Sequence, residues 1–549
     1  MSENDGGDGS SATDGPVPAP SRRDLLKLAG VAGAAAAAGP ILLGARKARA
    51  SNVGIITTAI ERDAIVIGSG FGGAVTALRL TEHGVDTLLL EKGKRWVRTP
   101  GVDTFSPYIY PDGRSTWLSH TTVVPLGPPL PIPRRTGVLE GHDFGNVTVL
   151  TGAAYGGGSI VYGGLYVKPP RHLFERVFPA QVPYAEMEPY YERVASKIGI
   201  SSIPEDVLAS DYHTHYRVME QHCRRAGVEV DRIRSGTDWN IVRQELAGTI
   251  APSVIHGEAI YGVESGAKKT LDVSYLADAE ATGLFEARTL RQVTDIARSD
   301  DGSYLVFVER IDERGCVEAE ETYRCQYLFL AAGSIGTSKL LVRARATGLL
   351  PDLDEQVGKG WGNNGNVYAL RTLIPESTGR WQGGPPASAI KDHDNPIAPL
   401  YIEHPQLPLG LDLHYLLYFG MGIHGTRGHF EYDRWTDQVR LRWPRFFNEQ
   451  QTINRAMLYT MRRLNQANGG ITSSLVGGLK GYRDDAVYHP LGGAVLGQAC
   501  DHVGRVKHHD RLYVNDSALV PGFTGCANPA FTVAALAERN IARILAEDL

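Results

Sequence analysis

Two glycine clusters in the first third of the chain have the spacing of a site that holds a dinucleotide. Before the first cluster, the uninterrupted apolar run 64–67 predicts a buried strand, and after it residues 74–82 predict a helix. Glycines between them allow a tight turn, let the backbone approach a pyrophosphate and let the helix pack closely on the strand. The motif is Gly68-Ser69-Gly70-Phe71-Gly72-Gly73.

An acidic residue supports this interpretation. Glu91 ends the next apolar strand, 87–90, about 20 residues after the motif, where a carboxylate accepts hydrogen bonds from a ribose. A carboxylate at this point disfavours a 2′-phosphate, so we expect FAD or NAD rather than NADP. The alternative is a glycine-rich turn in an unrelated α/β fold.

The second cluster spans residues 151–164 and contains three consecutive glycines, Gly156 to Gly158. Consecutive glycines cost conformational entropy on folding, which makes sense where the backbone must lie against a flat ligand. A flexible linker is the alternative, but the apolar residues Ile160, Val161 and Leu165 argue against it.

The dipeptide Asn528-Pro529 marks the start of a helix that runs to the C-terminus. Asn is favoured at the N-cap and Pro at the first helical position, and apolar residues such as Val533, Leu536 and Ile541 follow three to five positions apart. Because a helix N-terminus favours negative charge, a polar side chain at Asn528 is well placed for chemistry.

Three separate parts of the chain must position these residues. Segment 327–333 has the pattern of a buried strand that meets a helix, and segment 512–514 that of a short strand before Asp516. We therefore predict an α/β protein (α+β overall) with a Rossmann-like domain built from three chain segments, 60–97, 269–358 and 504–549. Residues 98–268 and 359–503 are expected to form a substrate domain with a mostly antiparallel sheet and helices.

The composition is that of a globular protein and excludes several classes. The chain has 549 residues, 42% of them apolar and 21% charged, with a net charge of −5. These values exclude a coiled coil, a multi-span membrane protein and the basic surface of a nucleic-acid binder. Its five cysteines are widely spaced without a Cys-x-x-Cys pattern, which excludes a Cys-rich zinc site and a disulfide framework but leaves one incidental bridge open. We expect no metal.

Residues 1–50 are expected to be an export signal and not part of the fold. Arg22-Arg23 precedes the weakly apolar stretch 28–44, and Ala48-Arg49-Ala50 has the pattern of a cleavage site. The paired arginines indicate twin-arginine export, with cleavage near Ala50 and secretion of the mature chain. An uncleaved membrane anchor is the alternative, although the stretch is short and Pro40 interrupts it.

From about residue 60 to its end, the sequence resembles the glucose–methanol–choline (GMC) flavin oxidoreductases. The resemblance rests on both glycine clusters, residues 327–336, Gly360 to Asn366, Tyr488-His489-Pro490-Leu491-Gly492-Gly493 and residues 528–540. It implies FAD rather than NAD, hydride transfer from an alcohol carbon to flavin N5, and reoxidation by O₂ to give H₂O₂. Some members attach the flavin through a histidine in the loop matching residues 151–165. No histidine occurs there, so we expect noncovalent FAD.

The resemblance also assigns catalytic roles to three residues. His489 matches the active-site histidine, which takes or holds the hydroxyl proton, and Asn528 matches a second residue beside the flavin ring. Glu403 matches a carboxylate that, in sterol-oxidising members, moves a proton between C4 and C6 of the oxidised product. A surface glutamate in a proline-rich loop is the alternative for Glu403.

The residues expected to contact FAD come from all three chain segments and from the loops between them. Four of them, Tyr162, Leu165, Ser517 and Ala530, differ from the residues usual beside the ring in sterol-oxidising members, so the substrate shape is expected to differ as well. The full set is Gly68, Gly70, Phe71, Gly72, Gly73, Glu91, Lys92, Gly152, Gly156, Gly157, Ser159, Tyr162, Gly163, Leu165, Val293, Gly333, His489, Asp516, Ser517, Asn528, Pro529 and Ala530.

The resemblance implies a secreted alcohol oxidase that oxidises the 3β-hydroxyl of cholesterol-like sterols and isomerises the 5-ene-3-ketone to the 4-ene-3-ketone. A GMC enzyme for another hydrophobic alcohol, or with an acceptor other than O₂, is the first alternative. A binding protein without turnover is the second, and His489 and Asn528 argue against it. We expect a hydrophobic alcohol and O₂ as partners and a monomeric chain. The proline-rich entrance segment 103–136 is expected to touch a membrane surface transiently.

Overall fold

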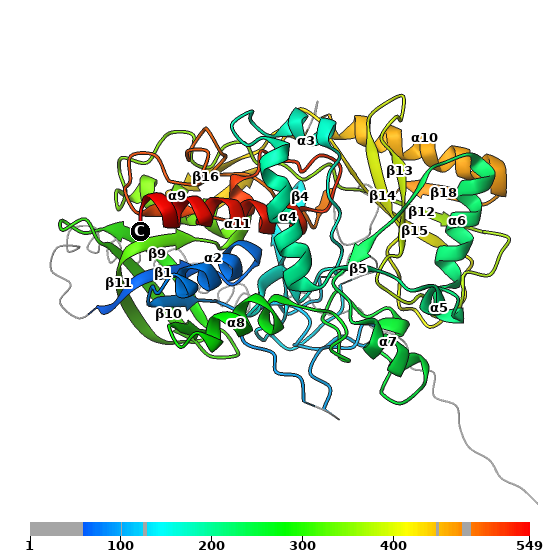
Figure 1. Ribbon diagram of the computed structural model, residues 1–549, viewed down its shortest axis with the longest axis horizontal. Coiled ribbons are helices and arrows are strands. Elements are labelled where there is room, and N and C mark those ends of the chain that lie inside the picture. Colours follow the sequence, from blue (N-terminus) through cyan, green and yellow to red (C-terminus); the bar gives the residue numbers. More distant parts are fainter. Residues whose placement is uncertain (1–58, 100–101, 124–128, 446–448, 475–484) are drawn as a thin grey trace, which may run out of the picture.

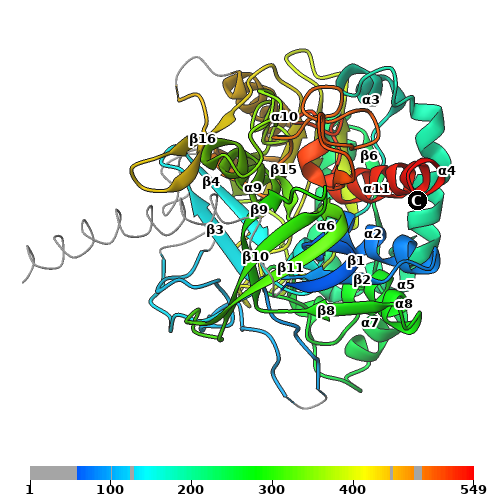
Figure 2. The same cartoon turned by 90° about the vertical axis from the view of Figure 1, so that its left-hand side faces the viewer.

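The computed structural model describes residues 59–99, 102–123, 129–445, 449–474 and 485–549. The predicted export signal, 1–50, lies outside the described residues. Two large sheets dominate the described part. Figure 1 shows them side by side with helices around them, and Figure 2 views the molecule from the side of the larger sheet.

The larger sheet has seven strands in the order β8–β2–β1–β11–β10–β9, with β20 also beside β11 (Figure 1). Neighbours pair in parallel from β8 to β11 and between β11 and β20, whereas β10 pairs antiparallel with both β9 and β11. The strands are β1 (Ile60–Ile67), β2 (Thr87–Leu90), β8 (Phe285–Arg288), β9 (Arg291–Arg298), β10 (Tyr304–Ile311), β11 (Val317–Leu330) and β20 (Leu512–Val514).

The core of this sheet is apolar on both faces, because helices cover it. Residues 64–67 and 87–90 are buried throughout, as expected for inner parallel strands. Among the covering helices are α2 (Phe71–Glu82), α4 (Tyr184–Ile198), α8 (Tyr275–Ala281), α9 (Gly333–Thr347) and α11 (Pro529–Glu547).

The second sheet is entirely antiparallel, in the order β18–β12–β15–β14–β13–β6. Because side chains alternate along a strand, one face packs its apolar residues on α6 (Thr214–Ala226) and α10 (Gln450–Asn468). The other face is left to line a cavity. The strands are β6 (Val230–Arg232), β12 (Val367–Thr372), β13 (Ser388–Asp392), β14 (Leu400–Glu403), β15 (Leu416–Gly422) and β18 (Ile471–Ser474).

Smaller elements connect the two sheets. A three-stranded sheet, β19–β4–β3, and two two-stranded ribbons complete the strands of the described residues. These strands are β3 (Leu139–Asp143), β4 (Val147–Gly152), β19 (Asp485–Val487), β5 (Ser201–Ser202), β7 (Arg234–Ser235), β16 (His429–Asp433) and β17 (Gln438–Arg442). The short helices are η2 (Gly157–Ser159), α3 (Arg171–Val177), α5 (Glu205–Leu208), η3 (Asp211–His213), α7 (Trp239–Leu246), η4 (Val254–His256), η5 (Leu271–Val273) and η6 (Ser517–Leu519).

The predicted mixed α/β fold class is confirmed. The predicted strands 64–67, 87–90 and 512–514 are present, and the first helix begins at Phe71, three residues earlier than expected, because Gly70 already serves as its N-cap. All five cysteines are free thiols, so the incidental bridge does not form. Among the described residues, no helix combines the length and the apolar character needed to cross a membrane.

Candidate active site

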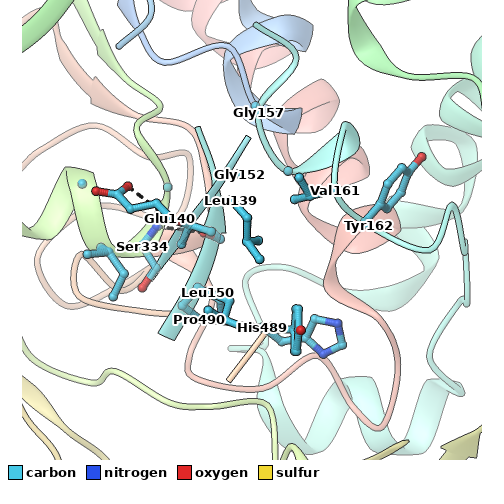
Figure 3. Close-up of a pocket in the computed structure, with 18 of the residues that line it drawn as sticks. Leu139, Glu140, Leu150, Gly152, Gly157, Val161, Tyr162, Ser334, His489 and Pro490 are labelled. Carbon is cyan, nitrogen blue, oxygen red and sulfur yellow. Dashed lines mark hydrogen bonds between the residues drawn. The ribbon is translucent and has the colours of Figure 1, made fainter. Parts of the chain in front are cut away.

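A cavity of about 690 Å³ lies where the ends of the parallel strands meet the open face of the antiparallel sheet. Its walls bring together the first glycine motif at Gly70, the second at Gly157, and the three predicted catalytic residues, Glu403, His489 and Asn528. Figure 3 shows part of this cavity: Leu139 and Leu150 on β3 and β4 lie between the loop that carries Gly157 and Val161 and the loop that carries His489 and Pro490.

The two glycine motifs form the nucleotide end of the cavity, and their backbones nearly touch. A Cβ on Gly157 would lie 2.6 Å from the Cα of Gly70, and a Cβ on Gly72 would lie 1.7 Å from the carbonyl oxygen of Asn515. A Cβ on Gly70, in contrast, would meet no protein atom within 4 Å. Gly157 and Gly72 are therefore needed for backbone packing, whereas Gly70 keeps space open at the N-terminus of α2.

Buried carboxylates fix the loops around this end. Glu91 accepts hydrogen bonds from the backbone N–H (3.0 Å) and hydroxyl (2.7 Å) of Ser69 and from Gly93 N–H (2.8 Å). Asp516 accepts from Gly333 N–H at 2.8 Å and from Ala518 N–H at 2.7 Å. Burial raises the pKa of Glu91 and that of Asp516, the latter to about 6. Both side chains also line the cavity.

All but three of the residues predicted to contact the cofactor line the cavity. The exceptions are Gly73, Gly156 and Ser159, which belong to the same loops but do not line the cavity. The Ser159 hydroxyl, for instance, donates to the carbonyl of Gly156 at 2.7 Å. Tyr162 lines the cavity, but its hydroxyl is 2.8 Å from that of Tyr166 and points away from the other labelled residues in Figure 3. Sequence spacing located this loop but did not show which of its residues face inward.

Glu403 is the last residue of β14 and lies opposite Phe419 of β15, so both side chains point into the cavity. Glu403 is only 3% exposed, and the alternative of a surface glutamate is therefore wrong. Burial raises its pKa to about 8, although a hydrogen bond from the Asn528 amide acts to lower it. The next residue, His404, anchors the strand end by donating from Nδ1 to the carbonyl of Leu417 at 2.6 Å.

Asn528 is the N-cap of α11, with Pro529 at its first turn, but its side chain makes no capping hydrogen bond. It contacts Glu403 instead. Oδ1 of Asn528 and Oε1 of Glu403 are both buried without a hydrogen-bond partner among the described residues. Buried acceptors of this kind are rare in native proteins unless a ligand or water meets them. The cavity thus contains two buried oxygens without a protein partner, and the one on Glu403 can also carry a proton.

Two asparagines fix the proton position of His489. Oδ1 of Asn366 accepts from the backbone N–H groups of Tyr488 (3.1 Å) and His489 (3.2 Å), so its Nδ2 must be the atom 3.0 Å from His489 Nδ1. The Asn364 amide lies 3.4 Å from the same nitrogen. Nδ1 is therefore an acceptor, and the ring proton sits on Nε2. Burial lowers the pKa of His489 to about 3, which keeps the imidazole neutral.

Sequence reasoning missed these supporting residues. Asn364 and Asn366 belong to one of the segments that carry the family resemblance, Gly360 to Asn366, but nothing in that segment predicted a contact with His489. It also missed the charged pair formed by Lys92 and Glu140, with His142 Nε2 3.3 Å from Glu140. Asn366 and His489 are 123 residues apart and Lys92 and Glu140 are 48 apart, so no local pattern shows these contacts.

Comparison with known proteins identifies the family. A family model described as GMC oxidoreductase matches residues 52–349, which is more than half of the chain. A second model with this description matches residues 427–537, and one described as GMC oxidoreductase, C-terminal, matches residues 364–476. The chain belongs to the GMC oxidoreductases. Members of this family bind FAD and act on alcohols.

Relatives of this GMC oxidoreductase differ in their named substrates. It is 26% identical to a cholesterol oxidase of Mycobacterium tuberculosis over 553 residues, which cover 87% of this chain and 90% of the relative. It is 25% identical to a long-chain-alcohol oxidase of Arabidopsis thaliana over 232 residues, 41% of this chain and 25% of that one. The fold is similar to that of a fungal aryl-alcohol oxidase, with a TM-score of 0.60, 15% identity and coverage of 89% and 100% of the two chains.

The residues of this GMC oxidoreductase fit the FAD that the family binds. Space at Gly70 opens onto the N-terminus of α2, which lacks a side-chain cap, so its N–H groups can meet a pyrophosphate. Glu91 lines the cavity near this N-terminus, where its carboxyl group can accept a hydrogen bond from a ribose. The unpartnered oxygens of Glu403 and Asn528 lie at the opposite end of the cavity.

Proposed function

We propose that this protein oxidises the 3β-hydroxyl of cholesterol-like sterols with O₂, forming H₂O₂, and isomerises the 5-ene-3-ketone to the 4-ene-3-ketone. The observation that carries the proposal is the buried Glu403 carboxyl, which faces the cavity beside Asn528 with its Oε1 unpartnered. An enzyme that only oxidises an alcohol has no use for an isomerisation base. The similarity to a cholesterol oxidase over nearly the full length of both chains supports the same choice.

FAD would be held noncovalently by Gly70, Glu91 and the second glycine cluster, because no histidine occurs in residues 151–165. When bound, FAD accepts a hydride from the alcohol carbon and passes the electrons to O₂. The chain's part is to bind the cofactor, orient the alcohol and manage its proton.

His489 orients the alcohol. Since its proton sits on Nε2, the ring donates a hydrogen bond to the hydroxyl oxygen and stabilises the negative charge that grows there. It therefore holds the hydroxyl rather than taking its proton. The hydroxyl proton must pass to another acceptor, and of the two unpartnered oxygens only the Glu403 carboxylate can keep a proton.

Glu403 can then serve isomerisation. Glu403 passes the hydroxyl proton to water, which balances the proton taken up when O₂ becomes H₂O₂. The carboxylate then removes a proton from C4 of the 5-ene-3-ketone and returns it to C6, which shifts the double bond into conjugation. Its pKa of about 8 makes both transfers feasible near neutral pH. The proton balance closes, because the same proton leaves C4 and arrives at C6.

A second candidate is oxidation of another hydrophobic alcohol, favoured by the partial similarity to a long-chain-alcohol oxidase. One experiment separates the candidates: the holoenzyme is mixed anaerobically with cholesterol, or with a long-chain or aryl alcohol, and flavin bleaching is followed before air is admitted. Bleaching by cholesterol with recovery in air supports the sterol proposal. Bleaching only by the other alcohols overturns it in favour of the second candidate, and no bleaching by any alcohol indicates a binding protein.

We also propose that the mature chain is secreted as a monomer and extracts its substrate from a lipid surface. Tyr108 and Leu407 line the cavity, and the neighbouring Ile109, Tyr110 and Leu411 are exposed, Tyr110 by 82%. The test replaces Tyr110 and Leu411 with serine and compares sterol turnover from vesicles and from detergent. A loss confined to vesicles supports lipid contact, and undiminished vesicle turnover contradicts it.

A further inference from the structure

A lysine outside the predicted site lies buried beside the cavity wall. Lys268, in the loop between η4 and η5, is 5% exposed. Its Nζ donates hydrogen bonds to three backbone carbonyl oxygens, those of Ile160 at 2.7 Å, Tyr162 at 2.9 Å and Ala259 at 3.1 Å. A protonated amine has three N–H donors, so every donor of Lys268 is used on the main chain.

These three carbonyls belong to two different walls. Ile160 and Tyr162 flank Val161 in the turn after η2, where Val161 and Tyr162 line the cavity, whereas Ala259 lines it from the loop after η4. The turn follows consecutive glycines, which lack side chains to pack and lose much conformational entropy when ordered. Lys268 thus supplies a cross-link between the glycine-rich turn and the opposite loop.

We propose that Lys268 is a positioning residue, whose ammonium group holds the turn 160–162 and the loop at Ala259 at the separation that receives the flavin ring and the alcohol. Its effect on turnover rests on the proposed function, but its effect on flavin retention rests only on the family's cofactor. Lys268 contacts no reacting atom and acts through the main chain.

The cross-link depends on protonation, because a neutral amine has only two N–H donors. Burial lowers the pKa of Lys268 to about 7, helped by Arg98 and opposed by Asp272 and Glu258. Arg98 in turn lies 3.9 Å from Asp272, and the amine also lies over the ring of Tyr162, 5.5 Å from its centroid. As pH rises through this pKa, one carbonyl loses its donor and the walls should loosen.

The test compares Lys268→Met, Lys268→Arg and the neighbouring Lys269→Met as a matched control. Flavin release is followed by the rise in flavin fluorescence after dilution of the holoenzyme, from pH 6 to pH 9 in steps of about one unit. KM and kcat are measured over the same range. We expect wild-type flavin release and KM to increase about tenfold with rising pH, from loss of one hydrogen bond to a charged donor. In K268M both should be raised at every pH, with that dependence lost.

In K268R flavin release and KM should stay constant from pH 6 to pH 9, because a guanidinium stays protonated over this range, and K269M should behave as wild type. K268M flavin release and KM equal to the wild-type values would overturn the proposal. If K268M fails to fold, K268R decides: an increase at the wild-type pH shows that Lys268 does not cause it. If flavin release changes in the variants as expected but the wild type does not turn over sterols, the result counts against the proposed function alone.

Discussion

Replacing Glu403 by Gln separates the two reactions proposed for this site. Gln keeps the size of the side chain and can still accept the hydrogen bond from Asn528, but it cannot carry a proton. A positioned acid–base group contributes about 10²–10⁴-fold, or about 3–5 kcal/mol. We expect isomerisation to fall by this factor. Oxidation should fall about tenfold or less, because a hydroxyl proton can leave through water whereas a carbon-bound proton cannot.

In the wild type, the pH dependence of isomerisation should report the ionisation of Glu403. With a pKa of about 8, about a tenth of Glu403 is ionised at pH 7, so isomerisation should rise with pH and level off above pH 8. E403Q should lose this rise. The assay adds the 5-ene-3-ketone directly and follows the absorbance of the conjugated product, while H₂O₂ release reports oxidation, with the exposed Glu355→Gln as control. Equal losses of both activities would refute the assignment of Glu403 as the isomerisation base.

Three further changes test other parts of the site. Asn528→Leu removes the hydrogen bond that lowers the Glu403 pKa, so the pH at which isomerisation levels off should rise; an unchanged profile would contradict that contact. His489→Ala, which removes the donor to the developing negative charge, should lower oxidation by about 10²–10³-fold yet leave isomerisation of added ketone within a few-fold, and parallel loss of both would argue for general collapse of the site. Gly70→Val should fold normally, as thermal unfolding of the apoprotein would show, but retain little flavin. Gly72→Ala, in contrast, should lower the unfolding temperature of the apoprotein. A Gly72→Ala apoprotein that is more stable than the Gly70→Val apoprotein would contradict this expectation.

The parts of the fold that are local in sequence could be predicted. The strand, turn, helix and second strand around Gly70 follow from apolar runs and glycines within about 30 residues, and the structure reproduces them. Glu403, His489 and Asn528 line one cavity, but their roles came from a family resemblance and remain predictions.

What could not be predicted depends on contacts between distant segments. Asn366 sets the proton of His489 across 123 residues, and Lys268 reaches Ile160 across 108. Neither residue has a local pattern that distinguishes it from an ordinary polar side chain. Ser159 was expected at the cofactor but its hydroxyl donates to Gly156, because a family resemblance does not say which side of an irregular loop each residue faces.

The placement of β20, α11 and Asn528 together in the third segment of the dinucleotide domain has a consequence for folding. Segment 504–549 supplies the parallel partner β20 of β11, the helix that packs on α2, and Asn528. A chain synthesised only as far as residue 503 therefore lacks a strand of the central sheet and one wall of the cavity. Capture of the cofactor must wait until this segment joins the fold, and a variant cut before Asn528 should yield a colourless product.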